Sequence, residues 1–127
     1  MSRGKVLLID DKLEFLKVLS ERLRLRGYEV TGVGSGGEAL QAVEQSPFDV
    51  IVLDLVMPVM DGVETLRRLR ALDPQAQIIV FSGYATSREV EQALALGATD
   101  FLAKPADLDT LMEHINQAIA KKGGVSQ

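Results

Sequence analysis

The sequence contains no cysteine and no tryptophan, and it has a single histidine, His114. The absence of cysteine excludes disulfides, thiolate zinc sites and cysteine nucleophiles. One histidine is too few for a histidine-rich metal site, and it disfavours a Ser/His catalytic pair. We expect His114 to lie on a helix surface without a functional role.

Long apolar runs and an excess of positive charge are also missing. The apolar run at residues 6–9 is followed by two aspartates, so it is far too short for a signal or membrane segment. The formal net charge is −4, whereas surfaces that bind phosphate backbones normally carry a basic excess. We therefore expect a cytoplasmic chain that binds neither membranes nor nucleic acids directly.

The length and composition indicate one globular domain. The 127 residues are enough for one ordinary domain and too few for two. Hydrophobic residues make up 46% and charged residues 25%, a balance that argues against disorder. Two glycines after Lys121 and Lys122 predict the end of the last helix. We expect a folded domain over residues 1–122 and a flexible tail over residues 123–127.

Short apolar runs alternate with helical patterns along the chain. The runs predict strands at residues 6–9, 29–33, 50–53, 78–81 and 100–103. Most are nearly continuous Val, Ile and Leu, which is typical of strands buried on both faces. Capping-box patterns begin at Ser35 and Thr86, and Gly27 and Gly97 stand where helices should end. The alternation predicts an α/β fold with a parallel sheet covered by helices on both faces.

Polar residues follow four of the five predicted strands. They are Asp10-Asp11, Asp54, Ser82-Gly83 and Lys104-Pro105. Ligands of open α/β sheets bind outside the carboxyl ends of the strands. Three carboxylates, a hydroxyl and an ammonium group therefore converge on one edge, provided that these four strands lie side by side.

Such a cluster of carboxylates needs a positive partner. Two like charges about 4 Å apart repel by roughly 4 kcal/mol at an effective dielectric constant near 20. A hard divalent cation relieves this repulsion, and oxygen ligands favour magnesium over zinc. Lys104 can relieve it too, as a point charge that also suits a phosphoryl group. Carboxylate, Mg²⁺, lysine and hydroxyl together suit phosphoryl transfer to an aspartate.

The motifs at these strand ends resemble those of the receiver domains of two-component response regulators. The matching residues are Asp10-Asp11, the segment 54–62 (Asp-Leu-Val-Met-Pro-Val-Met-Asp-Gly), Ser82-Gly83, and the segment 101–105 (Phe-Leu-Ala-Lys-Pro). Each motif alone is weak, but their order and spacing are highly specific. The resemblance covers the whole chain and implies a flavodoxin-like doubly wound sheet with strand order 2-1-3-4-5. That order comes from the family and not from the residue pattern.

The resemblance also implies a role for each matching position. Asp54 is then the phosphoacceptor, and Lys104 pairs with Asp54 or its phosphate. Mg²⁺ is bound directly by Asp11 and Asp54, through water by Asp10, and by the backbone carbonyl of Val56. The remaining roles concern four side chains: Ser82 donates to the phosphoryl group, Phe101 changes rotamer with the switch, and Val56 and Tyr84 tune hydrolysis. The bond before Pro105 is expected to be cis.

A receiver domain implies a set of partners. The phosphoryl donor is a phosphohistidine on a sensor histidine kinase or a histidine phosphotransfer protein. The output leaves through the face of helix 4, strand 5 and helix 5, toward an output partner or output domain that the sequence does not name. The resemblance allows a homodimer on phosphorylation. The domain catalyses its own phosphorylation and dephosphorylation but is not an enzyme with an external substrate.

Two other functions fit part of the pattern. An aspartyl-nucleophile phosphatase uses the same Asp, Ser, Lys and Mg²⁺, but it normally has a second acid two residues after the nucleophile, where this chain has Val56. A dinucleotide-binding module is suggested by Gly32, Gly34 and Gly37, which satisfy G-x-G-x-x-G between a strand and a helix. That motif belongs at a topological switch point, whereas strand 2 is expected at the edge of the sheet.

Overall fold

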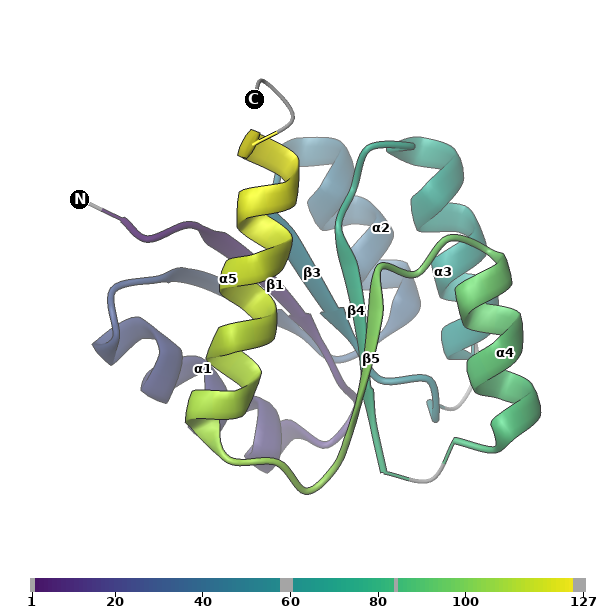
Figure 1. The fold of residues 1–127 in the computed structure, drawn as a ribbon, viewed down its shortest axis with the longest axis horizontal. Coiled ribbons are helices and arrows are strands. Elements are labelled where there is room, and N and C mark those ends of the chain that lie inside the picture. The colour runs from purple at the N-terminus through teal and green to yellow at the C-terminus, as the bar shows by residue number, and fades with distance from the viewer. Residues whose placement is uncertain (1, 58–60, 84, 125–127) are drawn as a thin grey trace.

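The computed structural model describes residues 2–57, 61–83 and 85–124 of the chain. Strands and helices alternate throughout these residues (Figure 1). The strands are β1 (Lys5–Ile9), β2 (Glu29–Val33), β3 (Val50–Leu53), β4 (Ile78–Ser82) and β5 (Asp100–Ala103). The helices are α1 (Leu13–Leu25), α2 (Gly36–Gln45), α3 (Gly62–Leu72), α4 (Ser87–Ala95) and α5 (Leu108–Gly124).

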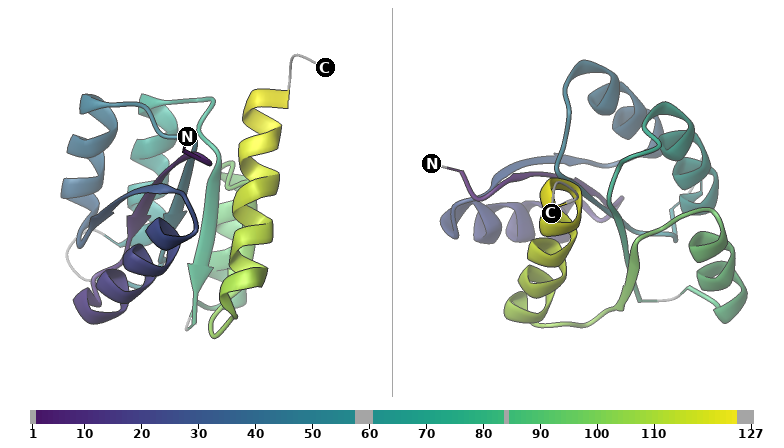
Figure 2. Two further views of the ribbon diagram at one scale, coloured as in Figure 1. Left: turned by 90° about the vertical axis from the view of Figure 1, so that its left-hand side faces the viewer. Right: turned by 45° about the horizontal axis from the view of Figure 1, so that its top comes forward.

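The five strands form one parallel sheet in the order β2-β1-β3-β4-β5, which confirms the expected doubly wound fold. Helices α1 and α5 cover one face of the sheet, and α2, α3 and α4 cover the other (Figures 1 and 2). The chain order reverses between β1 and β3, so the crevice at this switch point lies beyond the carboxyl ends of these two strands.

The hydrophobic core has two layers because successive strand residues point to opposite faces of the sheet. Leu7, Ile9 and Leu53 pack in the layer under α2, α3 and α4. Leu8 and Val52 pack in the layer under α1 and α5. Every residue of β3 and β4 is buried, which explains why these strands read as continuous apolar runs.

The ends of several helices follow the local sequence signals. Thr86 forms a complete capping box with Glu89 at the start of α4. Ser35 caps α2, but here the Glu38 carboxylate accepts a hydrogen bond from Gly34 N–H instead of completing a capping box (2.9 Å). Gly27 and Gly97 have φ angles of +98° and +102°, a region that glycine adopts without strain.

Three differences from the predicted elements concern their ends. β1 begins one residue earlier, at Lys5, and β4 extends by one residue to Ser82. α5 continues to Gly124, two residues beyond the expected domain limit at residue 122, so this helix does not end at the first glycine. Residues 125–127 of the expected tail lie outside the described residues. Among the helices that the structure describes, none is long and apolar enough to cross a membrane.

Candidate phosphoacceptor site

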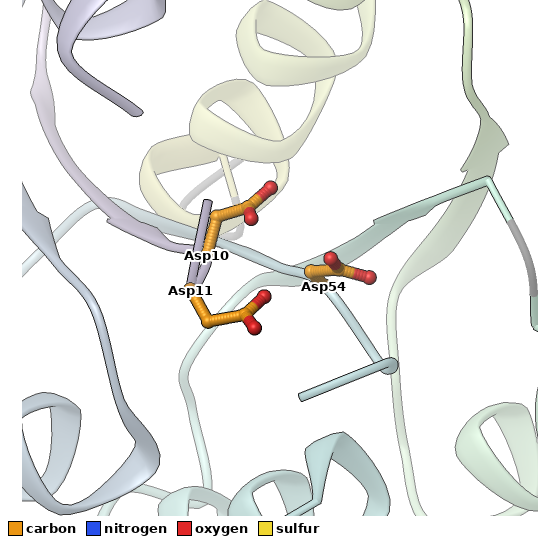
Figure 3. A group of neighbouring side chains, drawn as sticks. All are labelled: Asp10, Asp11 and Asp54. Atoms are coloured by element: carbon orange, nitrogen blue, oxygen red, sulfur yellow. The ribbon is translucent and has the colours of Figure 1, made fainter. Parts of the chain in front are cut away.

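The carboxyl ends of β1 and β3 bring three aspartates together, as the sequence predicts. Asp10 and Asp11 follow β1, and Asp54 follows β3. Each offers a carboxylate oxygen, and these oxygens all lie within 4.8 Å of one another. Figure 3 shows the three side chains pointing toward a shared space. Asp10 and Asp54 are buried, whereas Asp11 is partly exposed.

Backbone hydrogen bonds fix the position of Asp54. Its N–H donates to the carbonyl of Ile9 on the neighbouring strand (3.0 Å), which continues the sheet ladder by one residue. Val56 N–H in turn donates to Asp54 Oδ1 (3.1 Å). With 3% of its side chain exposed, Asp54 can face only the groups that line this pocket.

Ser82 comes from β4, which lies next to β3 in the sheet. Its hydroxyl donates a hydrogen bond to Asp54 Oδ1 (2.7 Å), and both residues are buried. The sequence predicts that Ser82 serves a phosphoryl group, and in this structure the hydroxyl binds the carboxylate that would carry it.

Lys104 follows β5 and reaches across β4 and β3 into the same pocket. Its Nζ lies 2.6 Å from Asp10 Oδ2 and 3.6 Å from Asp54 Oδ2. The nearer carboxylate is that of Asp10, while the family pattern gave only Asp54 or its phosphate. The ammonium also lies over the ring of Phe15 on α1, 4.2 Å from its centroid, which is a cation–π contact. The Lys104-Pro105 bond is cis, as expected.

Lys12 is a second cation in the pocket. Its Nζ lies 3.5 Å from Asp54 Oδ2 and 3.7 Å from Asp11 Oδ1. Burial lowers the pKa of Lys12, but the charges of Asp54, Asp10 and Asp11 outweigh burial and leave the pKa above its usual value. The ammonium group therefore stays protonated in the absence of metal. The position of Lys12 directly after the acidic pair is the sequence signal that points to this contact.

The residues present fit a hard divalent cation. Asp11 Oδ1 is buried and, among the described residues, has no hydrogen-bond partner, so one carboxylate oxygen is left available. Carboxylates in this number and this proximity are typical ligands of Mg²⁺. Beside them a cavity of about 430 Å³ opens. Its lining comprises Lys12, Phe15, Asp54, Val56, Gly83, Lys104 and Pro105.

Other predicted residues lie farther from the pocket or outside the described chain. Phe101, on β5, is partly buried and packs against the core layer under α2, α3 and α4. Val56 lines the cavity and has 37% of its surface exposed. Tyr84 and the motif residues 58–60 lie outside the described residues.

His114 differs from the surface residue that we expected. It is partly buried, and its Nδ1 contacts the carboxylate of Asp100 at the start of β5. This contact joins α5 to the edge strand and is a structural link rather than part of the pocket.

The glycine motif after β2 lies at an edge strand of the sheet, away from the switch point between β1 and β3. The structure therefore does not place Gly32, Gly34 and Gly37 where a dinucleotide site of this fold would be.

A doubly wound sheet with this acidic pocket, lysine and serine at its carboxyl edge is the architecture of a receiver domain. The family model described as the response regulator receiver domain matches residues 6–116. The chain therefore belongs to the receiver domains of two-component response regulators.

Solved structures similar to the chain support the same assignment. A CheY-like receiver domain protein from Methanospirillum hungatei is 28% identical, has a TM-score of 0.91, and is covered over 96% of its length by 94% of this chain. The receiver domain of the sensor histidine kinase PA1611 from Pseudomonas aeruginosa is 31% identical with a TM-score of 0.84. That comparison covers 92% of this chain and 98% of the other, and the solved structure has a magnesium ion coordinated in its active site cleft.

Curated relatives are longer proteins. The transcriptional regulatory protein ZraR of Salmonella typhimurium is 37% identical over 122 residues, which are 94% of this chain and 28% of ZraR. The transcriptional regulatory protein PrrA of Mycobacterium tuberculosis is 35% identical over 96% of this chain and 52% of PrrA. The chain thus spans about a quarter to a half of the relatives' length. The prediction that these 127 residues do not bind nucleic acid directly stays a prediction.

Proposed function

We propose that Asp54 accepts a phosphoryl group from a phosphohistidine of a sensor histidine kinase or a histidine phosphotransfer protein. The observation that carries this proposal is the convergence on one buried carboxylate of two further aspartates, a lysine and a serine from separate strand ends. Asp54 lies at the switch point of the sheet and opens onto the 430 Å³ cavity, so a donor can approach it from solvent.

The transfer forms one bond and breaks one. A carboxylate oxygen of Asp54 attacks phosphorus, and the P–N bond breaks with its electron pair staying on the imidazole nitrogen of the donor. Lys104 is positioned to pair with the negative charge of the phosphoryl oxygens. Buried Ser82 can donate its hydroxyl hydrogen to one of them once it leaves Asp54 Oδ1.

We assign the metal ligands by the same geometry. Asp11 and Asp54 would bind Mg²⁺ directly, Asp10 through water, and Val56 through its backbone carbonyl. The free Asp11 Oδ1 supports this set, as does the contact of Asp10 with Lys104, which already occupies one Asp10 oxygen. When bound, Mg²⁺ would neutralise the clustered carboxylates and the charge of the phosphoryl group.

A phosphatase with the same groups is less well supported. Such an enzyme needs an acid near the nucleophile to protonate the leaving group. Two residues after Asp54 stands the apolar Val56, which lines the cavity. We propose instead that Val56, together with Tyr84, limits access of water to the phosphorylated aspartate and so tunes its hydrolysis.

Intact-mass measurement after incubation with a small acyl phosphate and Mg²⁺ tests the proposal. We expect an alkali-labile gain of one phosphate, lost with EDTA and lost in Asp54→Asn. The control is Glu38→Gln, which removes an exposed carboxylate from the β2–α2 loop and should leave the gain intact. An equal gain of mass in Asp54→Asn would show that the phosphoacceptor is another residue.

We further propose that Ser82 and Phe101 transmit phosphorylation to the face of α4, β5 and α5. The β4–β5 register pairs Val80 with Phe101, so this ring lies beside the strand that ends at Ser82. Phosphorylation adds about −1.5 to −2 charges and three strong acceptor oxygens at Asp54. Movement of the Ser82 hydroxyl toward these oxygens would leave space into which the Phe101 ring can turn.

The energetics require more than Ser82. Shifting a two-state switch from 1:99 to 99:1 needs roughly 5.5 kcal/mol of differential interaction, and a hydrogen bond to a charged group contributes about 1.5–3 kcal/mol. The pair of Lys104 with the phosphoryl group must supply much of the rest. Ser82→Ala should therefore switch partly, and Lys104→Ala should fail more completely. NMR of the Phe101 ring with and without beryllofluoride measures this. Unchanged ring shifts alongside altered partner binding would exclude Phe101 as the link.

A further inference from the structure

The charges in the pocket divide into two groups. Lys104 neutralises Asp10, at 2.6 Å, and only 16% of the Lys104 side chain is exposed. Lys12 lies on the opposite pair, 3.5 Å from Asp54 Oδ2 and 3.7 Å from Asp11 Oδ1, and its side chain is 52% exposed. The more buried cation thus holds Asp10, while the more exposed cation holds Asp11 and Asp54.

Asp11 and Asp54 are the two side chains that the proposed metal site uses directly. An ammonium group near both carboxylates reduces their mutual repulsion, as a metal ion would. The same ammonium repels a divalent cation that approaches these oxygens, because Mg²⁺ binds at about 2.0–2.1 Å and carries twice the charge. Both cations therefore gain from the same negative field and oppose each other.

The backbone of Lys12 is fixed, whereas its side chain is free to move. Its N–H donates to Asp10 Oδ1 (2.9 Å), and the residue is the N-cap of α1, where its side chain makes no capping hydrogen bond. Lysine carries its charge on a flexible four-carbon stem. Since half of this side chain is exposed, the ammonium can turn into solvent without disturbing α1.

We propose that Lys12 is a tethered counter-ion that holds Asp11 and Asp54 in the metal-free domain and leaves them when a divalent cation binds. The inference rests on the proposed metal site and deepens it. Lys12 then lowers the affinity for Mg²⁺ and raises the stability of the metal-free form. A residue with a merely structural role would shift both quantities in the same direction.

The test compares Lys12→Gln, Lys12→Arg and Lys17→Gln with the unmodified chain. Lys17 is exposed on the same helix and does not line the cavity, so its replacement controls for the loss of one positive charge. Two measurements are made: Mg²⁺ affinity by calorimetric or NMR titration, and the melting temperature in EDTA.

Lys12→Gln should tighten Mg²⁺ binding by about 1.5- to fivefold, the range that pairs of exposed charges contribute. It should also lower the metal-free melting temperature by about 1–4 °C. Lys12→Arg keeps the charge and should stay near the unmodified chain. Lys17→Gln should change Mg²⁺ affinity less than Lys12→Gln.

The outcomes separate this proposal from the proposed function. Equal or weaker Mg²⁺ binding in Lys12→Gln would overturn the role of Lys12 and leave the metal site intact. The absence of Mg²⁺ binding in both the unmodified chain and Lys12→Gln would overturn the metal site, and the counter-ion role with it. Binding that appears only in Lys12→Gln would support the proposal in its strongest form.

Discussion

Two loops of this domain look alike in sequence and differ in what they can do. The loop after β2 contains Gly34, Gly36 and Gly37 and leads into α2, and the loop after β3 begins with Asp54 and leads through Gly62 into α3. The first satisfies a nucleotide-binding motif and lies beside an edge strand. The second lies at the switch point and faces Asp11 and Lys104. Position in the sheet, more than local motif, decides which loop becomes a site.

The glycines of the two loops show the same contrast. A Cβ on Gly62 would collide with the backbone of Leu55 and would lie 2.7 Å from the Asp54 carbonyl oxygen. A Cβ on Gly37 would meet nothing within 4 Å. Gly62 therefore allows α3 to start directly against the phosphoacceptor loop, where its N–H donates to Leu55 O (3.0 Å), while Gly37 has no such duty.

Removing a carboxylate should give the largest difference between the loops. Asp11→Ala should weaken Mg²⁺ binding by more than about 100-fold, and Asp10→Ala, which loses a water-mediated contact, by about 10- to 100-fold. Glu38→Gln, on the β2 loop, should have no effect. Isothermal titration of the three variants measures this. An Asp11→Ala variant that binds Mg²⁺ normally would show that the acidic cluster is only a solvated edge.

Gly62→Ala should give the next largest effect. The added methyl group overlaps backbone atoms that cannot turn away, so we expect a loss of about 3 kcal/mol in the free energy of unfolding, or more. Chemical denaturation monitored by circular dichroism gives the value. A loss below about 1 kcal/mol would mean that the two loops tolerate side chains equally well.

Gly37→Ala should have a smaller effect of opposite sign. Gly37 lies in the first turn of α2 in open space, so alanine reduces the freedom of the unfolded chain without a clash. The free energy of unfolding should rise by about 0.4–1 kcal/mol. The same denaturation experiment applies, and a destabilised Gly37→Ala variant would contradict the description of this loop as uncrowded.

Addition of NAD or FAD should have the smallest effect, namely none. A ligand at 100 times its dissociation constant raises stability by about 2.7 kcal/mol, which a melting curve detects easily. We expect no change of melting temperature with either dinucleotide. A rise that disappears when Gly34 is replaced by valine would restore the glycine loop as a binding site.

The sequence predicted the sheet well because its strands are short and distinct. Continuous Val, Ile and Leu runs between turn residues placed all five strands within one residue of their observed ends. The meeting of Asp10, Asp11, Asp54, Ser82 and Lys104 also followed, because parallel strands end at the same edge and a known family supplied the order. The order itself was not derivable from the apolar pattern, which is similar in each strand.

Contacts made by side chains across the fold were not predictable in the same way. Nothing in the pattern shows that Lys104 prefers Asp10 to Asp54, that Ser82 donates to Asp54, or that His114 contacts Asp100. These contacts depend on rotamers and on the relative position of elements distant in the chain. Lys12 was noticed as a neighbour of the acidic pair, but its two carboxylate partners became clear only from the coordinates.

The alternation of side chains along the strands gives the phosphoacceptor two separate audiences. Ser82 shares its parity with Ile78 and Val80, in the layer under α2, α3 and α4, and it binds Asp54 Oδ1. Lys104 shares its parity with Leu102, in the layer under α1 and α5, and it faces Oδ2 while resting on Phe15. The two oxygens of one carboxylate thus address opposite sides of the sheet. A single chemical event at Asp54 can be heard by both layers at once, through contacts that share no side chain.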